Sequence, residues 1–167
     1  MTVATEAVPT RLVVGIGEHG VSDRADQPLV AIGVGSCIIL CAWDGARRLA
    51  GMAHVVQPWS HHGRPRADAR YADQAVPLLL RSLSERGART SGLVVKMVGG
   101  ASVLLGGPPN GETLGAQNAR AVEQTLARYG LKVAARDVGG RHGRTVTFDP
   151  GTGTVLIRTL GRGEATL

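Results

Sequence analysis

Cys37 and His54 are the residues of this chain best suited to covalent chemistry. Cys37 ends the glycine-rich run GVGSC, and His54 lies in the apolar run GMAHVV. A thiolate is a strong nucleophile, and a nearby imidazole stabilises it and then protonates a departing amine. The backbone N–H of Cys37, with those of Ser36 and Gly35 beside it, is suited to bind an oxyanion. From spacing alone, a purely structural Cys37 stays open.

The pairing of two predicted strands decides whether this thiol and this imidazole meet. If Gly45 and Ala46 are the central residues of a two-residue turn, Cys37 lies directly opposite His54. If the turn is centred one residue earlier, Cys37 faces Met52, and His54 is its diagonal neighbour. Both registers keep the two residues on one face, because they differ by two residues in the strand pairing. A pairing shifted by a single residue would move His54 to the other face of the sheet. The sequence therefore permits a Cys-His pair without requiring one.

The other candidate residues each have a structural interpretation as well. Cys41 is expected to be structural, because four residues of strand separate the two Cα atoms by about 13 Å, too far for a disulfide. Ser36 is interpreted as a turn former rather than a nucleophile. Ser102 and Asn118 either cap the backbone or line the site.

Two basic segments hold the remaining candidates. His61 and His62 lie in an arginine-rich loop and are interpreted as solvated side chains, so we expect no metal site and no cofactor. His142 is expected in a turn. Arg141 and Arg144 are expected at the surface, or against an acidic partner.

The elements that must position these residues follow from hydrophobic periodicity and turn residues. Two helices are expected, over 71–86 and 116–129, with Pro77 disturbing the first turns of the former. Strands are expected over 11–16, 29–34, 37–43, 49–56, 93–98, 131–138, 145–148 and 154–159. Residues 17–27 and 58–70 are expected to be loops. This order predicts an α+β domain, with largely antiparallel sheet covered by two helices.

Composition sets the class of protein. The chain has 167 residues, 43% of them hydrophobic, which suits a single domain over 11–167 preceded by a flexible leader over 1–10. It has no apolar run long enough to span a membrane and no signal-peptide pattern, so we expect a cytoplasmic protein without membrane insertion. The net charge of +6 favours an acidic partner. No recognition-helix or aromatic-interleaved basic pattern accompanies that charge, so no nucleic-acid partner is expected, although the charge keeps a nucleic-acid-associated domain as an alternative.

An ordered set of motifs extends along nearly the whole chain. They are GVGSCIILCAWD, GMAHVVQP, YADQAV, GGAS, LGAQNARAV and DVGGRHGRTVTFDPGTGTVLIR. In this order they resemble the chemotaxis protein CheD family, over residues 11–161. The resemblance implies an α-β-β-α sandwich and a protein-glutamine deamidase that converts specific chemoreceptor glutamines to glutamate without a cofactor. It also implies a CheC-like phosphatase as a further partner in some species.

The resemblance also implies the site residues, with one departure. The family's nucleophile, the cysteine of the GSC motif, falls on Cys37, and its catalytic histidine falls on His54. The family's third catalytic residue is a threonine at the position held here by Ala31. Alanine accepts no hydrogen bond from an imidazole, so a backbone carbonyl, a water or another hydroxyl must orient His54. A weakly active or non-catalytic adaptor that binds a CheC-like phosphatase is therefore the alternative.

Overall fold

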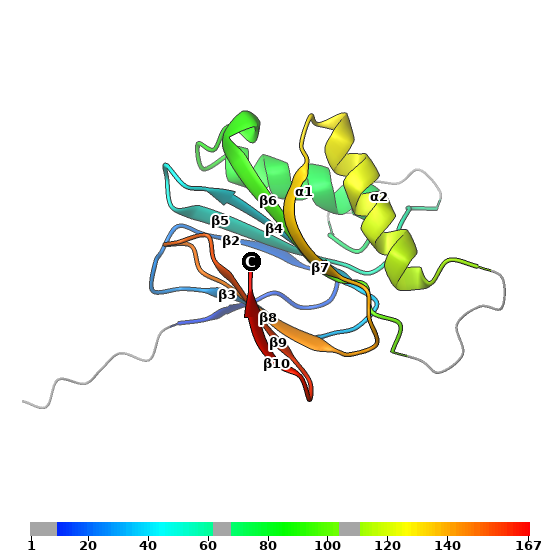
Figure 1. Ribbon diagram of the computed structural model, residues 1–167. Helices are drawn as coiled ribbons and strands as arrows, with labels where there is room; N and C mark the ends of the chain where they lie inside the picture. The colour runs from blue at the N-terminus through cyan, green and yellow to red at the C-terminus, as the bar shows by residue number, and fades with distance from the viewer. Residues whose placement is uncertain (1–9, 62–67, 104–110) are drawn as a thin grey trace, which may run out of the picture.

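A computed structural model describes residues 10–61, 68–103 and 111–167 as two five-stranded sheets and two α-helices (Figure 1). The predicted α+β fold is confirmed. Most of the predicted leader, together with His62, lies outside the described residues. Neither helix of the described part has the length and hydrophobicity needed to cross a membrane.

The central sheet has the strand order β2-β5-β4-β6-β7, and the outer sheet has the order β1-β3-β8-β9-β10. Strands of the central sheet are β2 (His19–Ser22), β4 (Ile38–Asp44), β5 (Leu49–Val55), β6 (Leu93–Gly99) and β7 (Val133–Val138). Strands of the outer sheet are β1 (Leu12–Val13), β3 (Leu29–Val34), β8 (Arg144–Phe148), β9 (Val155–Thr159) and β10 (Gly163–Thr166). Among the strands of the described residues, only β1–β3 and β6–β7 pair in parallel, so both sheets are largely antiparallel, as predicted.

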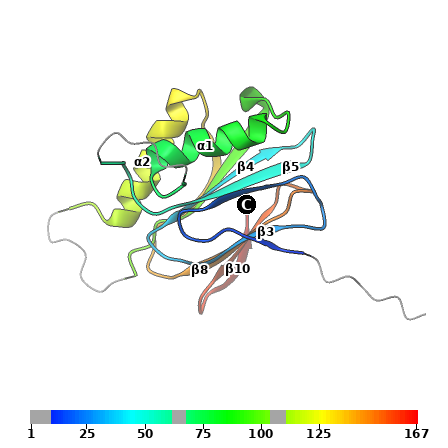
Figure 2. The same ribbon diagram turned by 180° about the vertical axis from the view of Figure 1, so that it is seen from behind.

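Both helices, α1 (Ala72–Ser84) and α2 (Leu114–Arg128), cover the free face of the central sheet (Figures 1 and 2). A short 3-10 turn, η1 (Thr90–Gly92), precedes β6. We expected helices on the outer faces of both sheets. The helices instead share one hydrophobic cluster with β4 and β5, so within the described ranges the layers are helices, central sheet and outer sheet. Helix α1 continues through Pro77 as one element.

Strands β4 and β5 of the central sheet are buried on both faces, which explains their nearly continuous apolar sequences. In β4, Ile38 and Leu40 pack toward the helices, whereas Ile39 and Cys41 pack toward the outer sheet. The second set belongs to a cluster between the two sheets, to which β3, β8 and β9 contribute their inward residues. A side chain at the end of this inter-sheet layer is therefore packed between residues of the central sheet and residues of the outer sheet.

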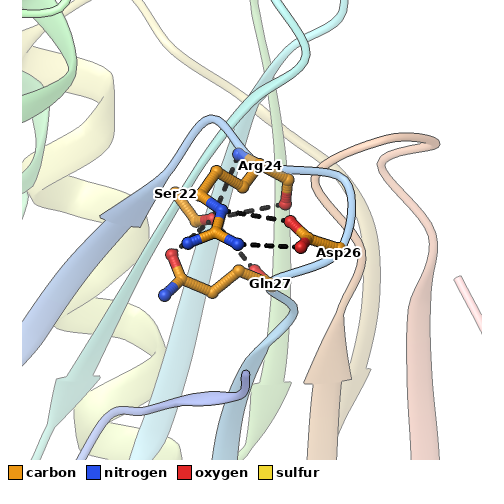
Figure 3. Close-up of polar contacts among 4 residues, drawn as sticks. All are labelled: Ser22, Arg24, Asp26 and Gln27. Atoms are coloured by element: carbon orange, nitrogen blue, oxygen red, sulfur yellow. Dashed lines mark hydrogen bonds and ion pairs between the residues drawn. The ribbon is translucent and has the colours of Figure 1, made fainter. Parts of the chain in front are cut away.

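The loop from β2 to β3 carries the chain from the central sheet to the outer sheet, and several polar contacts form within it (Figure 3). The buried hydroxyl of Ser22 donates to the carbonyl oxygen of Gln27 at 2.9 Å. The guanidinium of Arg24 donates two hydrogen bonds to the carboxylate of Asp26, at 3.1 and 2.8 Å. These contacts close the turn that brings β3 against β1.

Two strands were missed by the sequence prediction, and both are strands with weak patterns. Strand β2 lies within the predicted loop 17–27, and β10 follows the last predicted strand. Every residue of strand β10 is exposed, and among the described strands β10 pairs only with β9, whereas β2 is the edge strand beside β5. Because neither presents a continuous apolar face, neither shows the alternation that identifies a half-buried strand.

Candidate active site

The β4–β5 hairpin has a register that differs from both predicted ones. Asp44 pairs with Leu49, which leaves a four-residue loop over 45–48, and Ile39 pairs with His54. The predicted two-residue turns were wrong because the buried carboxylate of Asp44 holds a longer loop. It accepts hydrogen bonds from the backbone N–H of Arg47 at 3.2 Å and from its guanidinium at 3.1 Å.

The observed register still places Cys37 and His54 on one face of the sheet. Cys37 precedes Ile39 by two residues, so it is the diagonal neighbour of His54, at about 7–8 Å between the backbones. Cys37 lies just before the first residue of β4 and packs against the cluster between the sheets. Its half-buried thiol and the imidazole thus share the same end of the inter-sheet layer.

The ring of His54 is buried and held through one nitrogen. Only 2% of the residue is exposed, and Nδ1 lies 3.3 Å from the carbonyl oxygen of Val14. A carbonyl only accepts hydrogen bonds, so Nδ1 donates, and in the neutral ring Nε2 is left as the acceptor. Nε2 is buried and has no hydrogen-bond partner within the described ranges. Of the two ring nitrogens, Nε2 is therefore the one that the described residues leave without a partner.

The segment that supplies this carbonyl also fixes the backbone of His54. The N–H of Gly17 donates to the His54 carbonyl at 3.0 Å, and the His54 N–H donates to the carbonyl of Glu18 at 2.9 Å. The N–H of Val14 is itself bound to the Val30 carbonyl at 2.8 Å. Ala31, the next residue, is fully buried between the sheets. A backbone carbonyl, one of the three expected sources, thus takes the place of a side-chain acceptor at Ala31.

The turn before Cys37 is held by a second turn that follows β6. The N–H of Gly100 donates to the Cys37 carbonyl at 2.8 Å, and the N–H of Ala101 donates to the Gly35 carbonyl at 2.9 Å. Gly99 has a φ of +123°, and a Cβ at this position would lie 2.2 Å from the Cys37 carbonyl oxygen. Only glycine fits there, so the GGAS motif shapes the nucleophile turn through its backbone.

Two backbone N–H groups at this turn have no backbone acceptor in the described part of the chain. They are the N–H groups of Ser36 and Cys37, which precede β4 and take part in none of the turn and loop hydrogen bonds of the described residues. Ser102 lies beside the turn, one residue after Ala101, and its N–H donates to the Gly140 carbonyl at 2.9 Å. The predicted oxyanion and site-lining residues are thus gathered around Cys37.

Asn118 of helix α2 also contacts the turn before Cys37, and it is not the capping residue of its helix. Thr113 is the N-cap of α2 and accepts from the N–H of Ala116 at 3.2 Å. The fully buried side chain of Asn118 instead donates to the Ser36 carbonyl at 3.0 Å and to the Val56 carbonyl at 2.9 Å. It therefore connects the nucleophile turn to the end of the strand that carries His54.

Burial sets the ionisation of the two candidate catalytic groups. It raises the pKa of the Cys37 thiol above its ordinary value of 9.0. It lowers the pKa of His54 below 6.5, although the Val14 carbonyl and the Glu18 carboxylate partly oppose this. Both changes favour the uncharged forms at rest. Cys41 is completely buried between the sheets, and burial strongly raises its pKa too, which makes it unreactive.

Arg144 differs from its predicted surface position. It is 8% exposed, and its guanidinium donates to the Asp137 carboxylate and to the Gly139 carbonyl, both at 2.9 Å. The pairing of β8 with β3 places it opposite Val34, at the edge of the inter-sheet cluster. The charge pattern of the GGRHGR motif carried no signal of this burial. Arg141, in contrast, is exposed.

Comparison with known proteins places this chain within a family. The family model described as CheD chemotactic sensory transduction matches residues 57–159, a segment that begins after both Cys37 and His54. Among solved structures, a hypothetical protein, YfiH of Bacillus licheniformis, covers 74% of this chain and 49% of its own. Its TM-score is 0.47 at 10% identity, too distant to support a conclusion.

Curated relatives extend the match over the candidate site. A probable chemoreceptor glutamine deamidase CheD of Symbiobacterium thermophilum is 44% identical over 154 residues, covering 90% of this chain and 93% of that protein. A second, from Moorella thermoacetica, is 40% identical, covering 92% and 93%. The chemoreceptor glutamine deamidase CheD of Thermotoga maritima is 38% identical, covering 91% and 94%. The chain therefore belongs to the CheD family.

Proposed function

We propose that this protein hydrolyses the side-chain amide of specific chemoreceptor glutamines, with Cys37 as the nucleophile and His54 as the acid–base residue. The names of the relatives support the reaction class. The observation that carries the assignment of residues is the imidazole of His54, which is held through Nδ1 and leaves Nε2 unpaired on the face that carries Cys37. An inert core histidine would have both nitrogens satisfied.

The first half of the reaction forms a thioester. Nε2 of His54 takes the thiol proton, and Sγ of Cys37 attacks the carboxamide carbon of the glutamine. The backbone N–H of Cys37, with that of Ser36, binds the resulting oxyanion. The carbon–nitrogen bond then breaks while the imidazolium returns its proton to the leaving nitrogen, so that ammonia departs.

The second half releases glutamate and restores the enzyme. The neutral imidazole takes a proton from water, and the hydroxide that forms attacks the thioester carbon. The carbon–sulfur bond breaks, and the leaving thiolate recovers its proton from His54. Because burial favours the neutral thiol and the neutral imidazole, we propose proton transfer during attack rather than a permanent ion pair.

Mass spectrometry of a chemoreceptor cytoplasmic fragment tests this proposal. Incubation with the protein is expected to produce the mass increase of glutamine-to-glutamate conversion at defined positions. Cys37→Ala should abolish the increase, and Cys41→Ala, which removes the buried second thiol, should retain it. Unchanged conversion by Cys37→Ala would overturn the assignment of the nucleophile, and no conversion by the wild type would overturn the activity.

A non-catalytic adaptor is the second candidate, and the alanine at position 31 is the observation that favours it. Under this proposal a CheC-like phosphatase binds the protein. Copurification of a stable complex together with an absence of deamidation would support the adaptor. Binding to such a phosphatase and the cytoplasmic location both stay predictions.

A further inference from the structure

Asn118 contacts the peptide group that joins Ser36 to Cys37. Its Nδ2 lies 3.0 Å from the Ser36 carbonyl oxygen, and the side chain is fully buried. Its second acceptor, at 2.9 Å, is the carbonyl oxygen of Val56. Since both neighbours are carbonyl oxygens, only the amide nitrogen can face them, which settles the orientation of the side chain.

We infer that Asn118 is a positioning residue that aims the Cys37 N–H at the oxyanion. The Ser36 carbonyl and the Cys37 N–H belong to one planar peptide group, and no described peptide bond is cis. In a trans peptide these two groups point in opposite directions. A donor that holds the carbonyl therefore also sets the direction of the N–H. The same hydrogen bond polarises the peptide and strengthens the N–H as a donor.

The second hydrogen bond of Asn118 fixes this turn relative to the acid–base residue. Val56 follows His54 by two residues and lies just past the end of β5. One side chain thus spans the nucleophile turn and the histidine strand. Helix α2 comes close enough because Gly115 packs against Gly100, where a Cβ on Gly115 would lie 2.2 Å from the Gly100 carbonyl oxygen.

Packing of α2 alone does not account for an asparagine at this position. Oδ1 of Asn118 is buried and has no partner within the described ranges, and an unpaired buried acceptor destabilises a fold. An apolar residue would avoid that cost but would leave the Ser36 carbonyl without its donor. The contact with the peptide before Cys37 explains why the amide is present.

This inference rests on the proposed function, and two rates measured on the same variants test it. One is the kcat for deamidation of the receptor fragment, and the other is the rate of alkylation of Cys37 by iodoacetamide. Alkylation displaces iodide and forms no oxyanion, so it reports on the thiol alone. Asn118→Ala is expected to lower kcat by about 10- to 100-fold, with KM and the alkylation rate close to wild type.

Two further variants separate positioning from folding. Thr125→Val removes another buried hydrogen bond of α2, from Thr125 to the Ala121 carbonyl at 2.8 Å, and should leave kcat unchanged. Asn118→Ser keeps one donor and should lose less kcat than Asn118→Ala. It also serves as the test variant if the alanine variant fails to fold by circular dichroism.

Two outcomes would overturn the inference. One is a folded Asn118 variant with wild-type kcat, and the other is an alkylation rate that falls in proportion to kcat. If Cys37→Ala still deamidates, the proposed function itself fails. If Cys37→Ala is inactive while Asn118→Ala is fully active, only the positioning role fails.

Discussion

The carbonyl oxygen of Val14 accepts a hydrogen bond from Nδ1 of His54 at 3.3 Å. This contact matters because Ala31, where the resemblance to the family implies a threonine, has no polar side-chain atom. Val14 is held in turn by its own N–H, which donates to the carbonyl of Val30 at 2.8 Å. The orientation of the imidazole is therefore built into the pairing between β1 and β3.

Ala31→Thr tests whether the histidine is already oriented. We expect no gain in kcat, because the Val14 carbonyl occupies Nδ1. We also expect a loss of stability of about 1–3 kcal/mol, because the added hydroxyl and methyl enter a fully buried site. Deamidation kinetics and urea unfolding measure the two effects. A large rise in kcat would show that the carbonyl is a poor substitute for a hydroxyl.

The dependence of activity on pH should follow the ionisation of His54. Its pKa lies below 6.5 because of burial, and only the neutral ring accepts the thiol proton. We therefore expect kcat/KM to rise with pH through a midpoint below 6.5 and then to level off. Since burial raises the pKa of Cys37 above 9.0, alkylation by iodoacetamide should still be accelerating at pH 9. Alkylation that is already maximal at neutral pH would instead indicate a preformed ion pair.

Gly99→Ala should damage the site, whereas Gly130→Ala should not. Both glycines have positive φ, but a Cβ at Gly99 would lie 2.2 Å from the Cys37 carbonyl oxygen, whereas one at Gly130 meets no atom within 4 Å. Gly130→Ala is expected to cost about 1–2 kcal/mol of stability and to keep its activity. Gly99→Ala should lose at least about 10-fold in kcat by displacing the nucleophile turn. Equal kcat for the two variants would contradict the close approach.

Stability should fall in acid, in part because of His54. The folded state holds its pKa below 6.5, so below that pH the unfolded chain binds more protons and unfolding becomes easier. The stability that this lowered pKa contributes is present above pH 6.5 and is lost as the pH falls below it. His54→Gln should reduce the difference in unfolding free energy between neutral and acid pH. Burial of His19 acts in the same direction, so the double variant with His19→Gln should reduce it further.

Much of the arrangement was predictable because strands buried on both faces leave a strong apolar pattern. Strands β3 to β6 were predicted within a residue or so of their observed ends. Both predicted registers placed Cys37 and His54 on one face, and the observed register keeps them there because it differs by an even number of residues. The edge strands β2 and β10 were not, since they bury too little to show a pattern.

The sequence by itself determined which side chains have reactive chemistry and which two strands carry them. Only the three-dimensional structure shows the register, in which Asp44 accepts hydrogen bonds from Arg47 across a four-residue loop. It also decided what orients His54 and what holds the turn before Cys37. Val14 contributes a backbone carbonyl, which every residue possesses, and Asn118 reaches Ser36 from 82 residues away. Contacts of this kind depend on the packing of distant segments, so no local pattern in the sequence reveals them.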